Sequence, residues 1–190
     1  IGWGGVFNFV NNIVYNWVHR TADGGEYSTM SNFINNYYKP GPATLKNRKR
    51  IFYPATAFTY KNHSTLLKAL NYATEKGLKD YEGIFTIRLD ENAYTQNLYK
   101  YVMEHNLNVK FNGPIPREKV FEMYARSILV FPSYVESFGL PLLEAKLSGT
   151  YIIASDTPFC HEILDGYDKA EFFEELDYKK LGDMIFERIG

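Results

Sequence analysis

The chain has 190 residues, 45% of them hydrophobic and 17% aromatic, so it is long and apolar enough for one domain with a full core and is not a disordered chain. Its 21 basic and 22 acidic residues leave a net charge of -1, which gives no reason to expect nucleic acid or an anionic membrane as a partner. The single cysteine, Cys160, excludes an internal disulfide and a cysteine-based zinc cluster, and we expect a reducing, cytoplasmic location.

The first 50 residues differ in character from the rest. Residues 6–18 and 27–38 are apolar and are predicted to form two helices, and residues 39–50 read as a basic connector with proline and glycine. We interpret residues 1–50 as the remnant of a preceding domain plus a linker, and residues 51–190 as a separate domain.

From residue 51 onward, short apolar segments alternate with segments of helical periodicity. The predicted strands cover residues 51–55, 83–89, 108–113, 128–133, 150–155 and 170–175. The predicted helices cover residues 64–76, 94–106, 117–127, 140–149, 158–166 and 177–189. For the first of these helices, Ser64 is the predicted N-cap and Gly77 the predicted stop.

This alternation predicts an α/β fold with a doubly wound parallel sheet covered by helices on both faces. In such sheets ligands bind outside the carboxyl ends of the strands, at the point where the strand order reverses. The residues that directly follow the predicted strands are therefore the first candidates for a binding site. No apolar run is long enough to predict a membrane span.

Two carboxylates, Glu136 and Glu144, bracket the small and apolar residues of "SFGLPLL". Gly139 allows a close approach of the backbone to a ligand, and Pro141 suits the first turn of a helix. The amides of 138–140 would then form an anion site at a helix N-terminus, flanked by two acids that can accept hydrogen bonds from a diol. This layout suits a nucleotide sugar. The spacing alone leaves an equal alternative, in which Glu136 is a loop acid and Glu144 an exposed helix residue.

A longer run around these acids, "VFPSYVESFGLPLLEAKLSGTYIIASDTPFCHEIL", resembles the E-x7-E region of retaining glycosyltransferases with the GT-B fold, specifically family 4 (group 1). Similar segments precede it, "VKFNGPIPREKVFEMYARS" and "RIFYPATAFTYKNHSTLLKAL", so the resemblance covers residues 50–189 in order. It implies a Rossmann-like domain, the C-terminal half of a GT-B fold, that binds a nucleoside-diphosphate sugar.

The resemblance also implies roles for individual residues. Lys61 and Glu136 match catalytic positions: the lysine neutralises the diphosphate of the leaving group, and the glutamate contacts the donor sugar. Glu144 matches the acid that binds the ribose hydroxyls. The remaining implied donor-binding residues are Ser137, Phe138, Gly139, Leu140, Gly113 and Glu162.

One departure from the family pattern concerns the diphosphate. Many members place an arginine five or six residues before the lysine, where this chain has Ala55 and Thr56, and Arg88 or Arg117 could compensate. His63 is more simply read as a structural residue of the turn after Lys61 than as a catalytic one. The sequence has no D-x-D element and no histidine pair with ligand spacing, so we expect metal-independent chemistry and no cofactor besides the donor substrate.

The resemblance further implies that an N-terminal acceptor domain is missing, and we expect the chain to be a fragment or a truncated form. The expected function is donor binding for transfer of a hexose from a nucleoside diphosphate to a glycan or lipid-linked acceptor, with at most peripheral membrane contact on the inner face. Two alternatives stay open: a non-catalytic nucleotide-sugar-binding subunit, and a nucleotide-sugar epimerase with the GT-B fold.

Overall fold

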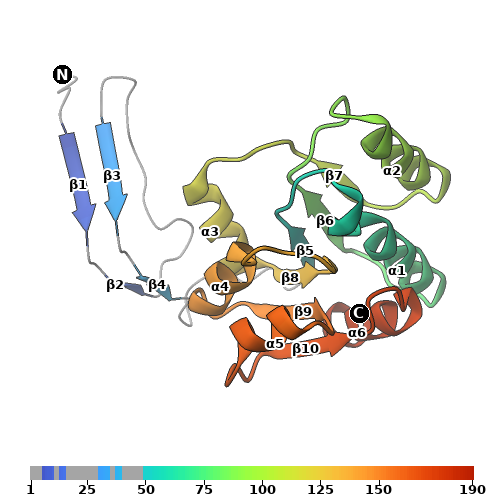
Figure 1. The fold of residues 1–190 in the computed structure, drawn as a ribbon. Helices are drawn as coiled ribbons and strands as arrows, with labels where there is room; N and C mark the ends of the chain where they lie inside the picture. The colour runs from blue at the N-terminus through green and yellow to red at the C-terminus, as the bar shows by residue number, and fades with distance from the viewer. Residues whose placement is uncertain (1–5, 11–12, 16–29, 35–36, 40–48) are drawn as a thin grey trace.

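Six parallel strands form the central sheet in the computed structural model, which describes residues 6–10, 13–15, 30–34, 37–39 and 49–190 (Figure 1). Each hydrogen-bonded pair in this sheet is parallel, and the strand order is β10-β9-β8-β5-β6-β7. The strands are β5 (Arg50–Tyr53), β6 (Glu82–Phe85), β7 (Val109–Phe111), β8 (Ile128–Phe131), β9 (Tyr151–Ser155) and β10 (Ala170–Phe173). The predicted doubly wound parallel sheet is thereby confirmed.

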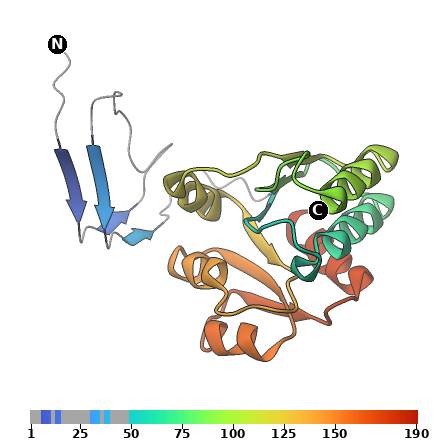
Figure 2. The ribbon, with the colours of Figure 1, turned by 45° about the horizontal axis from the view of Figure 1, so that its top comes forward.

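Helices cover both faces of this sheet (Figures 1 and 2). Three of them, which contact one another through α1, lie on one side, and the other three lie on the opposite side. The first group is α1 (His63–Glu75), α2 (Ala93–Glu104) and α6 (Tyr178–Ile189). The second group is α3 (Arg117–Arg126), α4 (Leu140–Leu147) and α5 (Pro158–Leu164). Among the described residues, no helix is long and apolar enough to cross a membrane.

The central strands are apolar on both faces because both faces are covered. All four residues of β8 are buried, and three of the four residues of β5 are fully buried. Aromatic rings fill the space beneath the helices: the ring of Phe52 on β5 meets that of Tyr124 on α3 edge-on, with centroids 5.5 Å apart. This core fixes the ends of β5 and β8 relative to each other.

The strand order reverses between β5 and β8. From β5 the chain proceeds through β6 to β7 on one side, whereas β8 is followed by β9 and β10 on the other side. The connections that leave the carboxyl ends of β5 and β8 therefore lead to strands on opposite sides, and it is at this position that ligands bind in doubly wound sheets. The short 3-10 helix η1 (Thr59–Lys61) lies in the connection after β5. We call the region between the two connections the switch crevice.

The prediction of two N-terminal helices is wrong. Within residues 6–39, the described parts form four strands, in which β1 (Val6–Val10) pairs in parallel with β3 (Met30–Ile34), and β2 (Ile13–Tyr15) with β4 (Tyr37–Lys39). The segments are rich in valine, isoleucine, phenylalanine and tyrosine, which lose side-chain freedom in helices and favour strands. Residues 11–12, 16–29 and 35–36 lie outside the described residues. Most of the predicted connector, residues 40–48, lies outside the described residues, and the assignment of residues 1–50 to a preceding domain stays a prediction.

Candidate functional site

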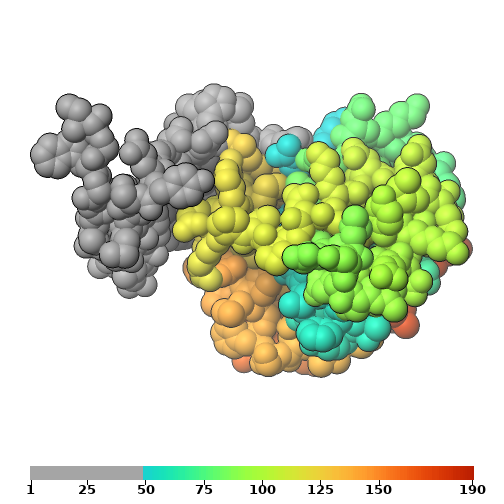
Figure 3. Space-filling view, turned by 90° about the horizontal axis from the view of Figure 1, so that it is seen from above, coloured from blue at the N-terminus to red at the C-terminus, as the bar shows by residue number. Residues whose placement is uncertain are grey.

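The switch crevice brings together two of the predicted site residues. Lys61 ends η1 after β5, and Glu136 lies in the connection after β8, 75 residues later in the sequence. The Lys61 Nζ lies 2.6 Å from Glu136 Oε1, and the two side chains are only 15% and 9% exposed. Figure 3 shows the two connections against each other on one face, one drawn in cyan and the other in orange. The sheet order thus places a well-shielded cation and carboxylate at the position where ligands bind in this fold.

Backbone contacts hold the two connections together. The carbonyl of Tyr60 accepts a hydrogen bond from the Tyr134 amide at 3.2 Å and from Ser133 Oγ at 3.3 Å. Ser133 is fully buried, and its own carbonyl accepts a hydrogen bond from Ser155 Oγ at the end of β9. The residues before Lys61 and before Glu136 are therefore attached to the same buried polar cluster.

Asn62 is a second contact between the connections, and sequence reasoning did not single it out. Its side-chain amide donates to the carbonyls of Pro132, at 3.1 Å, and of Glu175, at 2.8 Å. Its backbone is left-handed, with φ at 57°, a conformation that asparagine tolerates better than other non-glycine residues. An asparagine directly after Lys61 and before a predicted helix was the signal that could have identified it.

Gly139 forms the N-terminal boundary of α4, close to Glu136 in the sequence. Its φ is 73°, which favours glycine, and a Cβ at this position would lie 3.0 Å from Ile163 Cδ1, so this methyl group would have to shift to admit a side chain. Pro141 lies in the first turn of α4 as predicted. On either side of the buried Gly139, the side chains of Phe138 and Leu140 are 56% and 57% exposed. The start of α4 therefore carries exposed apolar side chains on either side of a buried glycine.

Glu144 lies in its own cluster further along α4. Its carboxylate is 2.7 Å from the Arg117 guanidinium and accepts a hydrogen bond from Tyr124 Oη at 3.2 Å. The Glu144 side chain is 14% exposed, whereas that of Arg117 is 71% exposed. Burial, followed by the charge of Glu144, raises the pKa of Tyr124 well above its ordinary value, so this hydroxyl stays a donor. Glu144 therefore has a neutral hydrogen-bond donor, Tyr124, on one side and an exposed cation, Arg117, on the other.

The remaining predicted positions are more dispersed. Gly113 follows the edge strand β7, with φ at 66°, and a Cβ there would lie 3.2 Å from Arg88 Cγ. The Arg88 guanidinium is held by both oxygens of Asp90, at 2.9 and 2.8 Å. Ser137 and Glu162 are exposed. Both candidate replacements for the arginine missing from the family pattern, Arg88 and Arg117, thus contact acids outside the Lys61–Glu136 pair.

His63, the residue after Asn62, is a core residue. It is fully buried against the rings of Tyr53 and Phe85, with centroids 4.7 and 5.2 Å away, and neither ring nitrogen has a hydrogen-bond partner among the described residues. Burial, helped by the nearby Lys61 charge, lowers the pKa of His63 to about 3. The ring is therefore neutral and structural, as expected from the sequence.

The predicted cap of α1 is wrong. The helix begins at His63, so Ser64 lies inside its first turn and not at the N-cap. Asn62 occupies the N-cap without a side-chain capping bond, and its side-chain NH₂ group donates instead to the Pro132 carbonyl. The amide of Ser64 instead donates to Tyr94 Oη of α2, at 3.4 Å. Tertiary contacts thus replace the local cap. The predicted stop at Gly77 agrees with the structure, since the helix ends at Glu75 and Gly77 has φ at 107°.

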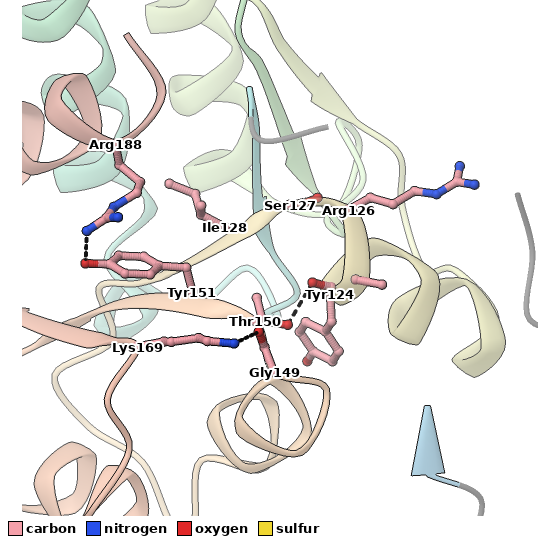
Figure 4. A pocket seen from close by; sticks show the side chains of 10 residues that line it. Tyr124, Arg126, Ser127, Ile128, Gly149, Thr150, Tyr151, Lys169 and Arg188 are labelled. Atoms are coloured by element: carbon pink, nitrogen blue, oxygen red, sulfur yellow. Dashed lines mark hydrogen bonds between the residues drawn. The ribbon is translucent and has the colours of Figure 1, made fainter. Parts of the chain in front are cut away.

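A separate cavity of about 290 Å³ lies at the opposite edge of the sheet, beside the amino ends of β8 and β9 (Figure 4). Three basic residues line it, and each has a partner. Lys169 Nζ donates to the Gly149 carbonyl at 3.3 Å, and Arg126 pairs with Glu122 at 3.2 Å. Arg188 pairs with Glu171 at 2.9 Å while its guanidinium lies over the Tyr151 ring. The cavity contains neither Lys61 nor Glu136 and is distinct from the switch crevice. Among the described residues, no three potential metal ligands of the histidine, cysteine or carboxylate type gather at one place.

Comparison with known proteins shows the family of the chain. The family model described as "Glycosyl transferases group 1" matches residues 38–187. A D-inositol 3-phosphate glycosyltransferase of Streptomyces bingchenggensis is 32% identical over 92 residues, which cover 43% of this chain and 20% of that protein. The chain spans between a tenth and about a fifth of the first curated relatives that it matches.

Solved structures share the fold. The catalytic domain of cholesterol-alpha-glucosyltransferase from Helicobacter pylori has a TM-score of 0.61 at 20% identity, over 74% of this chain and 85% of that one. Anabaena Alr3699/HepE in complex with UDP-glucose has a TM-score of 0.64 at 17% identity, over 80% of this chain and 46% of that one. At these identities the likeness concerns the fold.

Proposed function

Because the chain belongs to the group 1 glycosyl transferase family, we propose that its residues 50–189 bind the nucleoside-diphosphate-sugar donor of a retaining hexosyltransferase. The acceptor is a glycan or a lipid-linked acceptor, and it is bound with the help of a further domain of the complete protein. The Anabaena structure, which holds UDP-glucose, supports a UDP-hexose as the first donor to test.

The observation that carries this proposal is the Lys61–Glu136 pair in the switch crevice. A lysine and a carboxylate with side chains only 15% and 9% exposed are costly to desolvate, and the ion pair offsets that cost. A diphosphate entering the crevice would give the lysine a new anionic partner. The carboxylate would then accept hydrogen bonds from the donor sugar.

The start of α4 supplies the complementary half of the proposed site. A helix N-terminus presents unpaired amides that favour a phosphate, and Gly139, the N-cap of α4, lies only a few residues after Glu136 in the sequence. Glu144, one turn further along α4, is proposed to accept hydrogen bonds from the ribose diol. In this arrangement Arg117, which now pairs with Glu144, lies beside the nucleoside.

The proposed chemistry relies on stabilisation of the leaving group. The bond between the anomeric carbon and the diphosphate oxygen breaks. The acceptor hydroxyl attacks the anomeric carbon from the face that the diphosphate leaves and gives its proton to the departing diphosphate oxygen. Negative charge develops on the departing diphosphate, where the Lys61 ammonium and the α4 amides stabilise it. Glu136 orients the sugar.

A non-catalytic donor-binding subunit is the second candidate. The observation that favours it is Ala55 and Thr56, which stand where many relatives have an arginine for the diphosphate. In the structure, Arg88 contacts Asp90 and Arg117 contacts Glu144, so the diphosphate site has one cation fewer. Saturable donor binding without hydrolysis or transfer in the complete protein would favour this candidate.

A calorimetric panel tests the proposal. The chain is titrated with UDP-, GDP- and ADP-sugars, and the same titrations are repeated with Lys61→Gln. Lys169→Gln is the matched control, because it removes a lysine from the cavity at the opposite edge of the sheet. We expect one class of nucleotide sugar to bind, Lys61→Gln to weaken it about tenfold or more, and Lys169→Gln to leave it unchanged. No binding by any member of the panel, or equal losses in both variants, would count against the proposal.

A further inference from the structure

We propose that Asn62 is a positioning residue that fixes Lys61 opposite Glu136 by joining three connections at the carboxyl edge of the sheet. The inference rests on the proposed function, since the pair that Asn62 positions is the proposed donor-binding pair. It assigns to Asn62 a role that acts through Lys61 and not by contact with the donor.

The contacts of Asn62 reach both sides of the crevice. The residue directly follows Lys61 in the connection after β5, and its side-chain amide donates to the carbonyl of Pro132, which directly follows β8, and to that of Glu175, which follows β10. Asn62 is only 3% exposed, so water does not substitute for these contacts. One side chain therefore links the connections after β5, β8 and β10.

The backbone of Asn62 has a separate task. With φ at 57°, its amide donates to the Thr59 carbonyl at 2.9 Å and its carbonyl accepts from the Thr65 amide at 3.2 Å, so the residue turns the chain from η1 into α1. Glycine could adopt this turn without strain, but it has no side-chain amide. The two tasks can therefore be separated by a single substitution.

The contacts of Asn62 affect donor binding because Lys61 and Glu136 belong to separate parts of the chain and must be held a short distance apart. Their 2.6 Å contact depends on the spacing of two connections that are 75 residues apart. A preorganised site loses affinity when its supporting contacts are removed, even if every residue that touches the ligand is kept. Loss of the Asn62 amide would also leave the buried Pro132 carbonyl without this donor.

The test compares Asn62→Gly with Asn106→Gly. Asn106 is also left-handed, with φ at 50°, but it lies at the amino side of β7, so the pair is matched in chemistry and backbone conformation. Two quantities are measured under conditions where both variants are fully folded. One is amide hydrogen exchange of residues 133–137, without ligand. The other is the affinity for UDP-glucose or for the nucleotide sugar that the wild-type chain binds best.

We expect Asn62→Gly to speed exchange at residues 133–137 by about tenfold or more and to weaken donor binding about tenfold, whereas Asn106→Gly changes neither. Asn62→Asp should weaken donor binding at least as much, because the new carboxylate would face two carbonyl oxygens and could not donate a hydrogen bond to either. If Asn62→Gly lowers thermal stability but leaves both exchange and affinity as in the wild type, Asn62 is merely structural and the inference is wrong.

The hydrogen-exchange arm keeps the inference separate from the proposed function. If no nucleotide sugar binds to the wild-type chain, the proposed function fails, but exchange at residues 133–137 still reports whether Asn62 holds the connection after β8. Unchanged exchange in Asn62→Gly would overturn the positioning role whatever the ligand.

Discussion

The Lys61 ammonium and the Glu136 carboxylate form a 2.6 Å ion pair although 75 residues separate them in the sequence. This ion pair holds together the loop after β5 and the loop after β8, which leave the sheet where its strand order reverses. Because both side chains are largely shielded from solvent, each depends on the other for compensation of its charge.

Removing one member of this pair should therefore destabilise the fold. We expect Lys61→Met to lower the free energy of unfolding by about 1–3 kcal/mol, because Glu136 is left as a shielded carboxylate without its partner. Urea unfolding measures the effect. The control is Lys100→Met, which breaks an exposed i,i+4 pair with Glu104 and should change stability by less than about 0.5 kcal/mol.

A double-mutant cycle sharpens this first prediction. If the pair acts as a unit, Lys61→Met combined with Glu136→Leu should be less destabilised than the sum of the two single changes. Strict additivity of the two substitutions would contradict the interpretation that the two charges compensate each other.

The turn into α4 should favour glycine over alanine. Gly139→Ala adds a Cβ 3.0 Å from Ile163 Cδ1 and forces alanine to φ 73°, so we expect a loss of about 2–4 kcal/mol in thermal or urea unfolding. Gly166→Ala is the control for backbone strain alone, since its φ is 66° and nothing lies within 4 Å of the added Cβ. It should cost about 1–2 kcal/mol. Equal losses at the two positions would show that packing against Ile163 contributes nothing.

His63 should make the fold sensitive to acid. Its pKa is lowered to about 3 in the folded chain, so between pH 6.5 and about 3 the unfolded chain binds a proton that the folded chain does not. Stability therefore falls as the pH is lowered through this window, by up to about 1.4 kcal/mol per pH unit from this residue.

The His63→Phe variant keeps a ring packed against Tyr53 and Phe85 and removes the titratable imidazole. We expect its unfolding free energy to fall less steeply between pH 6.5 and 4 than that of the wild type, measured by urea unfolding at each pH. His105→Phe, at an exposed position, is the matched control. Identical slopes for His63→Phe and the wild type would contradict a buried neutral histidine.

The fold of residues 50–189 could be predicted from the sequence because its strands are short, apolar and separated by amphipathic segments, as in β8 and α3. The same criteria gave a wrong prediction for the N-terminal segments. Apolar residues in 6–18 and 27–38 fit a helical period, but their β-branched and aromatic side chains favour the strands that form. In these segments the strand preference of the side chains outweighs the helical spacing of the apolar residues.

The candidate site was predictable in part. A doubly wound sheet places residues after its first and fourth strands side by side, so the approach of Lys61 to Glu136 follows from the strand order. The partners of Glu144 did not follow from it. Arg117 and Tyr124 reach this acid through the packing of α3 against α4, and the amide of Asn62 selects its carbonyl acceptors only in the folded chain.

The central claim is that Glu136 and Glu144 bind different parts of the donor: Glu136 the sugar and Glu144 the ribose. Calorimetric titration of the wild-type chain, Glu136→Gln and Glu144→Gln with UDP and with UDP-glucose, or with the best donor of the panel, tests it most directly. Glu144→Gln should weaken both ligands about tenfold to a hundredfold, because a hydrogen bond to a charged group is worth about 1.5–3 kcal/mol and the ribose is common to both.

Glu136→Gln should leave UDP affinity within about threefold of the wild type, since in the proposed site this residue contacts the sugar and not the nucleotide, and its loss frees Lys61 for the diphosphate. UDP-glucose binding should weaken about tenfold. Equal losses for both ligands in both variants would contradict the account, because the two acids would then not recognise different parts of one nucleotide sugar.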